Sequence, residues 1–455
     1  MDVPRELLAA VCETTDAPAA LAEAATDKSG VVGRAGLVAR PRTAAEVAAV
    51  LVLANRHGFP VVPRGAGTGR CGGAVPERGG VVLDLMRMDR ILEIDRREAV
   101  ARVQPGVRLG ALQQAVEAVG LWFPPDPASA RDCAVGGAVA TSAGGLRGAK
   151  YGTMKHYVLG LEVVLPTGDV IRTGARTRKS VTGYDMTSLF VGSEGTLGVV
   201  TEATLRLVPL PEAAATLVAW FDDADAVARG IAAALDAPLV PRALEFLDAR
   251  SLDAVLAHVP GLTAHGRAGL VLVECDGAAE AVAREIAQMA DALRAAGACH
   301  VAQATDPAEA ARLWEARRAV SPAVTARWPQ RLAEDVCVPR TQFVRMIADL
   351  HAIAARHGLA ALGFGHAGDG NIHASVLMER GDPEERERAH AAVGDVFRRA
   401  LELGGTLSAE HGIAITKRAF LPLELTPEAL AAQVAIKRAL DPRGVLNPGK
   451  IFPGT

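Results

Sequence analysis

Apolar runs of strand length alternate with helical patterns through the first half of the chain. Four runs predict strands, at residues 37–40, 59–62, 81–85 and 99–103. Between the first two runs, Thr43 can cap a helix that continues to about His57, with Glu46 at its third position as in a capping box. Two later apolar runs, at 157–165 and 170–173, flank Pro-Thr-Gly-Asp and predict a β-hairpin.

Pro209-Leu-Pro211 separates this pattern from a second one. Beyond it the glycine-rich loops stop, and we predict strands at 215–221, 243–246 and 270–274 and helices at 224–235 and 278–296. Asp306 can cap a further helix, with a break expected near Ser321-Pro322. The pattern predicts four parts: an N-terminal lead-in at 1–36, a first domain at 37–210, a second at 211–404, and a C-terminal segment at 405–455 that packs back on the first domain.

The stretch at 363–373, Gly-Phe-Gly-His-Ala-Gly-Asp-Gly-Asn-Ile-His, predicts another hairpin. Its Asp-Gly pair favours a two-residue turn, and apolar runs flank it on both sides. In that register His366 lies directly opposite His373, with Cβ atoms about 4.5–5.5 Å apart. Two imidazoles at this spacing can share a metal ion, and Glu410 in Ser-Ala-Glu-His-Gly offers a third ligand. A histidine pair that binds nothing is the alternative.

Composition and charge narrow the classes of function. The chain has 455 residues, enough for two or three domains, and its net charge of −3 includes no basic block, which argues against nucleic acid as a partner. The six cysteines are scattered without a Cys-x-x-Cys pair, so we expect reduced thiols. We expect a cytoplasmic chain, since we find neither a signal-peptide core nor an apolar run of about 20 residues. Peripheral attachment to the inner face of a membrane stays open.

A glycine-rich loop follows the predicted strand at 59–62. Gly67, Gly69 and Gly72 match the pattern GxGxxG, but a nicotinamide-binding fingerprint needs these glycines to open a helix. The Gly-Gly-Ala-Val-Pro that comes next cannot sustain a helix. We therefore interpret the loop as a backbone cradle whose N–H groups face a pyrophosphate. An ordinary flexible loop is the alternative.

Further motifs follow this loop in order: Pro-Pro-Asp-Pro-Ala-Ser at 124–129, Gly-Gly at 136–137, Thr-Ser-Ala-Gly-Gly at 141–145, Tyr-Gly at 151–152 and Gly-Ser-Glu-Gly-Thr-Leu-Gly at 192–198. Together they resemble the flavin-binding domain of the vanillyl-alcohol oxidase/p-cresol methylhydroxylase superfamily. The histidine hairpin and the Glu-His-Gly at 410–412 narrow the resemblance to the flavin-linked 2-hydroxy acid dehydrogenases, the branch of D-lactate dehydrogenase, the glycolate oxidase D subunit and D-2-hydroxyglutarate dehydrogenase.

The resemblance covers about residues 37 to 453 and implies an α+β fold. A two-subdomain FAD-binding domain of the p-cresol methylhydroxylase type would occupy 37–210, and a ferredoxin-like cap or substrate domain would occupy 211–404. The residues implied to bind FAD are Arg64, Gly65, Ala66, Gly67, Thr68, Gly69, Pro125, Asp126, Ser129, Gly136, Gly137, Thr141, Ser142, Gly144, Gly145, Tyr151, Gly152, Glu194, Gly195, Gly198, Val199, Val200 and Asn447. His156 is the nearest candidate for a covalent link to the flavin, and we expect none.

The resemblance also implies a reaction centre. His366, His373 and Glu410 would hold a divalent metal, zinc or manganese. His411 would accept the substrate's hydroxyl proton as general base or, alternatively, only orient the alkoxide. Arg317 would bind the substrate carboxylate, with a surface position on a helix as the alternative.

The sequence departs from the family pattern at four points, the first three of which bear on the substrate. Ser321 stands where a threonine is common, and Ser375 where an asparagine is common. The segment 333–339 lacks a lysine that the hydroxyglutarate branch uses, which favours a small or apolar 2-hydroxy acid over a dicarboxylate. Ala414 replaces an expected glycine, so a positive φ at this position is in doubt.

The expected activity is therefore metal-assisted oxidation of a D-2-hydroxy acid, similar to lactate or glycolate, to the 2-oxo acid with hydride transfer to FAD. Electrons would pass on to a quinone, a cytochrome or an electron-transfer flavoprotein. Two alternatives stay open: an oxidase of another alcohol or sugar acid that uses oxygen, and a flavin-carrying subunit of a larger complex. Whether the chain forms a homodimer also stays open.

Overall fold

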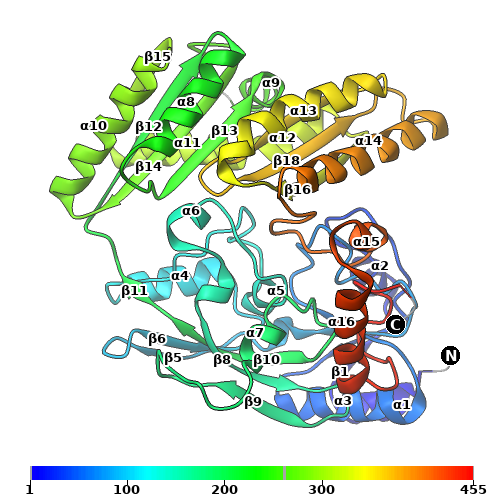
Figure 1. Ribbon diagram of the computed structural model, residues 1–455. Helices are drawn as coiled ribbons and strands as arrows, with labels where there is room; N and C mark the ends of the chain where they lie inside the picture. Colours follow the sequence, from blue (N-terminus) through cyan, green and yellow to red (C-terminus); the bar gives the residue numbers. More distant parts are fainter. Residues whose placement is uncertain (1–2, 260–262, 454–455) are drawn as a thin grey trace. The chain divides into compact units, whose positions relative to one another are not determined.

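A computed structural model describes residues 3–259 and 263–453 of the chain (Figure 1). The chain divides into two compact units, which are described one at a time: unit 1 comprises residues 1–144, 153–210 and 410–455, and unit 2 comprises residues 145–152 and 211–409. Two boundaries differ from those expected, because the short segment 145–152 belongs to unit 2 and this unit continues to residue 409.

Unit 1 contains, within the described residues, a four-stranded sheet of order β1-β2-β4-β3 and a five-stranded sheet of order β5-β6-β10-β8-β9. The strands β2, β4 and β3 are parallel, whereas the five-stranded sheet is antiparallel throughout. Its strands are β1 (Glu13–Thr15), β2 (Leu37–Arg40), β3 (Val61–Arg64), β4 (Val81–Asp84), β5 (Ile91–Asp95), β6 (Val100–Val103), β7 (Leu121–Trp122), β8 (Val158–Val164), β9 (Val170–Gly174), β10 (Val199–Arg206) and β11 (Val208–Pro209). Its α-helices are α1 (Arg5–Ala9), α2 (Pro18–Ala24), α3 (Ala44–His57), α4 (Leu109–Glu117), α5 (Val135–Ala140), α7 (Met186–Phe190), α15 (Leu421–Glu424) and α16 (Pro427–Leu440).

The sequence explains the core of the first sheet. The strands β2 and β4 are almost continuously apolar and buried, as expected for parallel strands covered on both faces. Helix α3 buries Val47, Val50, Leu51 and Ala54, which recur at helical spacing and pack into the same core. The predicted cap is confirmed, because Oγ1 of Thr43 accepts a hydrogen bond from the Glu46 N–H at 3.2 Å.

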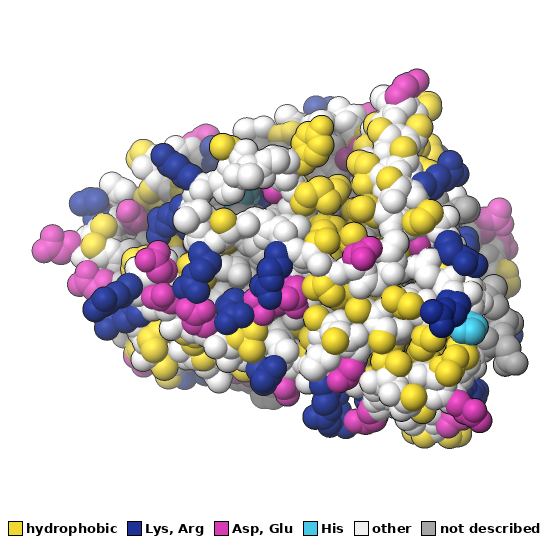
Figure 2. Space-filling model, turned by 90° about the horizontal axis from the view of Figure 1, so that it is seen from below, with side chains coloured by type: hydrophobic (Ala, Val, Ile, Leu, Met, Phe, Trp, Pro, Cys, Tyr) yellow, Lys and Arg dark blue, Asp and Glu magenta, His cyan; other side chains and the backbone are white. Residues whose placement is uncertain are grey.

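Charged side chains of both signs cover the five-stranded sheet. Arg176 pairs with Glu93 at 2.9 Å, and Arg102 pairs with Glu202 at 3.0 Å. Figure 2 shows a face of the molecule on which basic and acidic side chains lie next to one another without a block of one sign. Ion pairs as exposed as that of Arg176 contribute little to stability. Because the charges on this surface are mixed, we assign it no binding role.

Unit 2 contains, within the described residues, a seven-stranded antiparallel sheet of order β15-β12-β14-β13-β17-β18-β16. Its strands are β12 (Ala213–Phe221), β13 (Ala243–Asp248), β14 (Gly269–Gly277), β15 (His300–Gln303), β16 (Arg331–Cys337), β17 (Ala360–His366) and β18 (Asn371–Leu377). Its α-helices are α6 (Gly148–Tyr151), α8 (Ala224–Asp236), α9 (Ala249–His258), α10 (Ala279–Ala295), α11 (Pro307–Arg318), α12 (Val320–Arg327), α13 (Phe343–Arg356) and α14 (Pro383–Glu402). The α+β class is confirmed.

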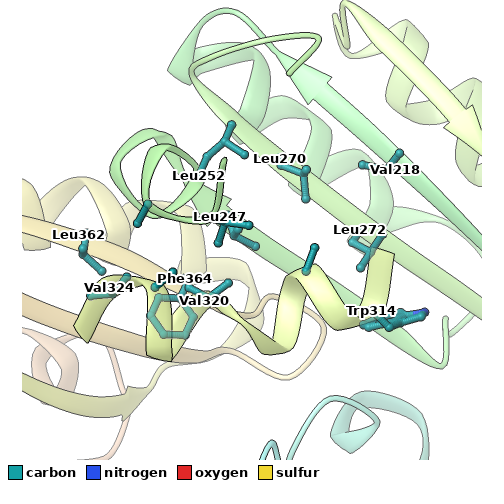
Figure 3. Packing of buried hydrophobic residues seen from close by; sticks show 14 of the residues in the cluster. Val218, Leu247, Leu252, Leu270, Leu272, Trp314, Val320, Val324, Leu362 and Phe364 are labelled. Atoms are coloured by element: carbon teal, nitrogen blue, oxygen red, sulfur yellow. The ribbon is translucent and has the colours of Figure 1, made fainter. Parts of the chain in front are cut away.

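Helices cover the two faces of this sheet (Figure 1). The helices α8, α10, α13 and α14 contact one another and the strands, and α9, α11 and α12 form a second group. Figure 3 shows the core under the second group, where Trp314 of α11 and Val320 and Val324 of α12 lie with Leu247 of β13 and Phe364 of β17. Helix α11 ends at Arg318 and α12 begins at Val320, slightly before the expected break.

The register predicted for the histidine hairpin is wrong. His366 pairs with Asn371 and Phe364 pairs with His373, so the loop spans four residues, 367–370, and not two. The carbonyl of His366 accepts hydrogen bonds from the N–H groups of Asp369 (3.3 Å) and Gly370 (3.0 Å), which closes this wider turn. The two histidines are therefore diagonal neighbours, and because residues two apart share a face of a strand, they still lie on the same side.

Among the described residues, no helix is both long and apolar enough to cross a membrane.

Candidate functional site

The glycine-rich loop after β3 presents backbone donors. No helix follows it, in agreement with our rejection of the nicotinamide-binding fingerprint. In the part of the chain that the structure describes, the N–H groups of residues 66–69 donate no hydrogen bond to another group of the chain. Gly67 has φ +69, and a Cβ there would lie 2.2 Å from Nη2 of Arg64. Four adjacent donors without protein acceptors suit the oxygens of a pyrophosphate.

Other predicted flavin contacts converge on this loop within unit 1. A Cβ on Gly65 would lie 3.3 Å from Cβ of Ala134, next to Gly137 of α5. Gly137 faces open space, because an added Cβ would meet no heavy atom within 4 Å. The Glu194 N–H donates to the carbonyl of Ala140 at 2.8 Å, which ties the segment 192–198 to the end of α5.

Asn447 joins the C-terminal segment to the same region. Its Nδ2 donates to the carbonyls of Gly73 (3.0 Å) and Glu194 (2.9 Å), and its N–H donates to Val61 of β3 (2.7 Å). Its Oδ1 is buried and accepts no hydrogen bond from the described chain. An unused buried acceptor near unused backbone donors fits a ligand with both phosphate oxygens and N–H groups, and FAD has both.

Backbone strain gathers around this region. Of six non-glycine residues with positive φ among the described ones, four lie here: Ser142, Glu194, Ala414 and Asn447. Such strain tends to occur at functional sites. Ala414 has φ +31, so the positive φ that its replacement of glycine put in doubt is present. Its N–H donates to Oε2 of Glu194 at 3.0 Å, a contact that helps to hold the strained conformation.

Glu194 is a buried carboxyl group in unit 1. Burial raises its pKa to about 7, although hydrogen bonds from the N–H groups of Ile413 and Ala414 favour the charged form. Oε1 accepts from Ile413 at 2.8 Å, so this side chain holds the C-terminal segment against the segment 192–198. The predicted contact Val199 contributes its side chain to the hydrophobic core, which leaves only its backbone for a ligand.

Three of the predicted flavin contacts, Gly145, Tyr151 and Gly152, lie in the segment that belongs to unit 2. The hydroxyl of Tyr151 donates to Oδ2 of Asp276 at 2.8 Å, and Nζ of Lys150 donates to Oδ1 of the same residue at 2.6 Å. Asp276 is buried, so both bonds fasten this segment to β14. The predicted contacts Pro125, Asp126 and Ser129 precede α5 in unit 1.

In unit 2, the predicted reaction residues lie along one face of the sheet. Glu245 of β13 is paired with His366 of β17, and Phe364 is paired with His373 of β18. The rings of His366 and His373 lie 5.3 Å apart, and the ring of Phe364 lies 5.0 Å from that of His373. Ser375 follows His373 by two residues on the same face and is buried.

Glu410 completes a group of three potential metal ligands. His366 and His373 belong to unit 2, and Glu410, the third predicted ligand, is the first residue of the C-terminal part of unit 1. Glu410 follows Ala409 directly, and the Ala409 N–H donates to Oδ2 of Asp335 at 2.8 Å. Asp335 is buried and lies directly opposite His373 across β16 and β18, and its carboxylate holds the backbone of Ala409, the residue before Glu410. Two imidazoles and a carboxylate are a ligand set that suits a divalent ion with open positions.

Arg317 is buried and not on the surface of α11. Its Nε donates to Oε2 of Glu245 at 2.8 Å, and its Nη2 lies 2.6 Å from the same oxygen in an ion pair. Its guanidinium carbon lies 5.3 Å from the centre of the Phe364 ring, so Arg317 belongs to the same face as the histidines. Ser321 lies in the first turn of α12, and His411, which follows Glu410, is half-buried.

Sequence reasoning missed Glu245 and Asp335. Both are acids within strands, Ala-Leu-Glu-Phe-Leu-Asp and Ala-Glu-Asp-Val-Cys, and both side chains are fully buried. A buried carboxylate is costly unless it is paired. An acid on the inward face of a strand was therefore the signal that could have identified them, once the register was known.

Two family descriptions match the chain. "FAD linked oxidases, C-terminal domain" matches residues 210–451, and "FAD binding domain" matches residues 35–174. The glycolate oxidase subunit GlcD of Bacillus subtilis is 42% identical over 91% of this chain and 88% of that protein. The D-lactate dehydrogenase of Anaerostipes hadrus is 35% identical over 93% of this chain and 91% of that protein.

Among solved structures, p-cresol methylhydroxylase superposes with a TM-score of 0.80 at 20% identity, over 98% of this chain and 96% of that one. At this identity the likeness shows the fold alone. It confirms the two-subdomain FAD-binding fold that the sequence predicted.

Proposed function

We infer the function from the family: this chain belongs to the FAD-linked oxidases, and its relatives include proteins named glycolate oxidase subunit GlcD and D-lactate dehydrogenase. It is an FAD-dependent oxidoreductase. We infer that it oxidises a small D-2-hydroxy acid, similar to lactate or glycolate, to the 2-oxo acid. The names of these relatives support a hydroxy acid as substrate.

Bound FAD supplies the acceptor for the hydride that leaves C2 of the substrate. The residues of unit 1 bind and position it. The N–H groups of residues 66–69 would hold the pyrophosphate, and Oδ1 of Asn447 would accept a hydrogen bond from the flavin. Glu194 keeps the C-terminal segment, and with it Asn447, close to this loop.

His366, His373 and Glu410 would hold a divalent ion, zinc or manganese, which supplies Lewis acidity to an oxygen ligand. Arg317 would bind the substrate carboxylate. His411 would accept the hydroxyl proton as general base. Ser321 and Ser375 would contact the substrate. The absence of a lysine at 333–339 supports a monocarboxylate.

The observation that carries this proposal is the arrangement on one sheet face of unit 2. Arg317 and His373 lie against Phe364, and the His366 ring lies 5.3 Å from that of His373. The buried Glu245 and Asp335 lie opposite His366 and His373 on the neighbouring strands. A cation for a carboxylate beside two potential metal ligands matches the two neighbouring oxygen groups of a 2-hydroxy acid. A domain that only carried flavin would have no need for this arrangement.

A second candidate is a flavin-carrying subunit within a complex, which the name of the Bacillus subtilis relative as a subunit supports. We expect electrons to pass to a quinone, a cytochrome or an electron-transfer flavoprotein. We further propose that the chain forms a homodimer and that it lies in the cytoplasm, where it could attach to a membrane surface. Oxygen as acceptor is tested by measuring peroxide in air.

The test is an anaerobic titration of the FAD-loaded protein with D-lactate, glycolate and D-2-hydroxyglutarate, followed by flavin absorbance near roughly 450 nm, the band that oxidised flavin supplies. We expect D-lactate or glycolate to bleach the flavin, and D-2-hydroxyglutarate to do so poorly. Bleaching by none of the three would remove the hydroxy acid proposal and favour another alcohol or the subunit role.

A further inference from the structure

We propose that Glu245 is a positioning residue that holds two parts of the reaction centre at once: the metal ligand His366 and the carboxylate-binding Arg317. This inference deepens the proposed function and rests on it. No motif in the sequence singles out Glu245, and its role follows from its place in the sheet and from its contacts.

Glu245 lies in the middle of β13, a strand in which every side chain is buried, and its own exposure is 0%. The ladder between β13 and β17 places it directly opposite His366. Side chains at such a pair of positions lie on the same face with Cβ atoms about 4.5–5.5 Å apart. The backbone register therefore brings this carboxylate to the imidazole.

Each carboxylate oxygen of Glu245 has a separate partner. Nδ1 of His366 lies 2.7 Å from Oε1, while Arg317 approaches Oε2 with Nε at 2.8 Å and Nη2 at 2.6 Å. A buried carboxylate is tolerated only when it is paired and hydrogen-bonded. Both oxygens meet this condition, and each one orients a different residue.

The contact with His366 selects a tautomer. An ionised carboxylate can only accept hydrogen bonds, so Nδ1 must carry the proton that it donates to Oε1. The lone pair then lies on Nε2, the nitrogen that would bind a metal. Carboxylate partners of this kind fix the ring orientation of metal-binding histidines, and their loss typically lowers metal affinity about 10–100-fold.

The contact with Arg317 fixes the plane of its guanidinium. With Nε hydrogen-bonded to Oε2 and Nη2 close to the same oxygen, the Nη1 and Nη2 N–H groups that do not bond Glu245 could bind a substrate carboxylate. The ring of Phe364, 5.3 Å from the guanidinium carbon, supports the same orientation. Without Glu245 the arginine would keep its charge but lose this orientation, and the buried charge would lose its partner.

The same sheet offers a matched control. Glu274 of β14 pairs with Nε of Arg242 at 2.8 Å, and both side chains are largely buried. The pair repeats the contact between glutamate and arginine without a histidine. The substitution Glu274→Gln therefore reports the general cost of removing a buried ion pair from this sheet.

The experiment compares E245Q and E274Q in the FAD-loaded protein. Mn²⁺ alone serves as the probe, and free Mn²⁺ is measured by electron paramagnetic resonance. We expect E245Q to bind Mn²⁺ about tenfold or more weakly than the wild type, and E274Q to bind within about twofold of it. At saturating Mn²⁺ and with the hydroxy acid that bleaches the flavin, E245Q should keep a raised KM, since Arg317 is no longer oriented.

The outcomes separate the two levels of inference. A wild type that does not bind Mn²⁺ would remove the proposed metal site together with the role of Glu245. A wild type that binds Mn²⁺, with E245Q binding equally well, would overturn the positioning role alone. Equal losses in E245Q and E274Q would reduce Glu245 to a structural ion pair.

Should E245Q fail to fold, a measurement on the wild type decides the matter. The metal-free protein with ¹⁵N-labelled histidine should show the His366 ring protonated at Nδ1, with its signal assigned from H366N. Protonation at Nε2 would overturn the proposal, because Glu245 could not then be accepting a hydrogen bond from Nδ1.

Discussion

The candidate sites of the two units consist of different kinds of chemical group. In unit 1 the groups proposed to face a ligand are mainly backbone, the N–H groups of residues 66–69 and the strained segments around Glu194 and Asn447. In unit 2 they are side chains on one face of an antiparallel sheet, held by buried carboxylates. The first site depends on where glycine permits a close approach, and the second depends on which residues the strand register places opposite one another.

This difference explains how each site responds to change. A backbone site is disrupted when a side chain is added, whereas a side-chain site is disrupted when one is removed. If the account is right, substitutions on the sheet of unit 2 should abolish turnover while FAD stays bound, and substitutions in the loops of unit 1 should weaken FAD while the metal stays bound.

The largest effect is expected for H373A. Loss of a metal ligand removes Lewis acid stabilisation of several kcal/mol, so kcat/KM should fall about 10³-fold or more, and bound FAD should be unchanged. H390A, which removes an exposed histidine from α14, is the control and should be silent. Loss of FAD from H373A would contradict the separation of the two sites.

For H411N we expect a loss of kcat of comparable size, within a wider range. A general base contributes about 10²–10⁴-fold, and kcat should fall by that factor with little change in the affinity for Mn²⁺. A loss of less than about tenfold would instead support the alternative in which His411 only orients the alkoxide.

The sequence was sufficient for the fold class, for most elements and for the order of the motifs, because glycine patterns, caps and apolar periods are local signals. The register of the histidine hairpin is set by neighbouring strands and not by a local signal. Asp369-Gly370 favoured a two-residue turn, but the strands β13 and β16 on either side fix a register in which His366 pairs with Asn371. Glu245 and Asp335 were missed for the same reason, since their partners lie on other strands.

An effect of intermediate size concerns stability and pH. The pKa of Glu194 is raised from its ordinary value of 4.5 to about 7, so the folded state keeps a proton that the unfolded state releases. The stabilisation, roughly 3 kcal/mol, is complete below about pH 4.5 and is lost as the pH rises through about 7. E194Q carries no such proton, so in the FAD-free protein the wild type should lose stability relative to E194Q across this window in thermal unfolding. A pH-independent difference would contradict the raised pKa.

The smallest effect is expected for G67A. Its Cβ would lie 2.2 Å from Nη2 of Arg64 at a positive φ, so the Arg64 side chain must move and the backbone is strained, and FAD affinity should fall about tenfold, or about 1.4 kcal/mol. G58A is the matched control, since Gly58 has φ +75 and the nearest atom to an added Cβ lies 3.8 Å away. It should cost stability without changing FAD affinity, as measured by fluorescence titration of the apoprotein.

The most direct test of the two separate sites is to treat the FAD-loaded protein with EDTA, quantify the FAD that stays bound, and then add the reducing hydroxy acid without oxygen. The account predicts that FAD stays bound, that flavin bleaching is lost, and that Mn²⁺ or Zn²⁺ restores it. Bleaching that persists after EDTA would show that the cluster of His366, His373 and Glu410 is not required for the reaction, and it would contradict the central claim.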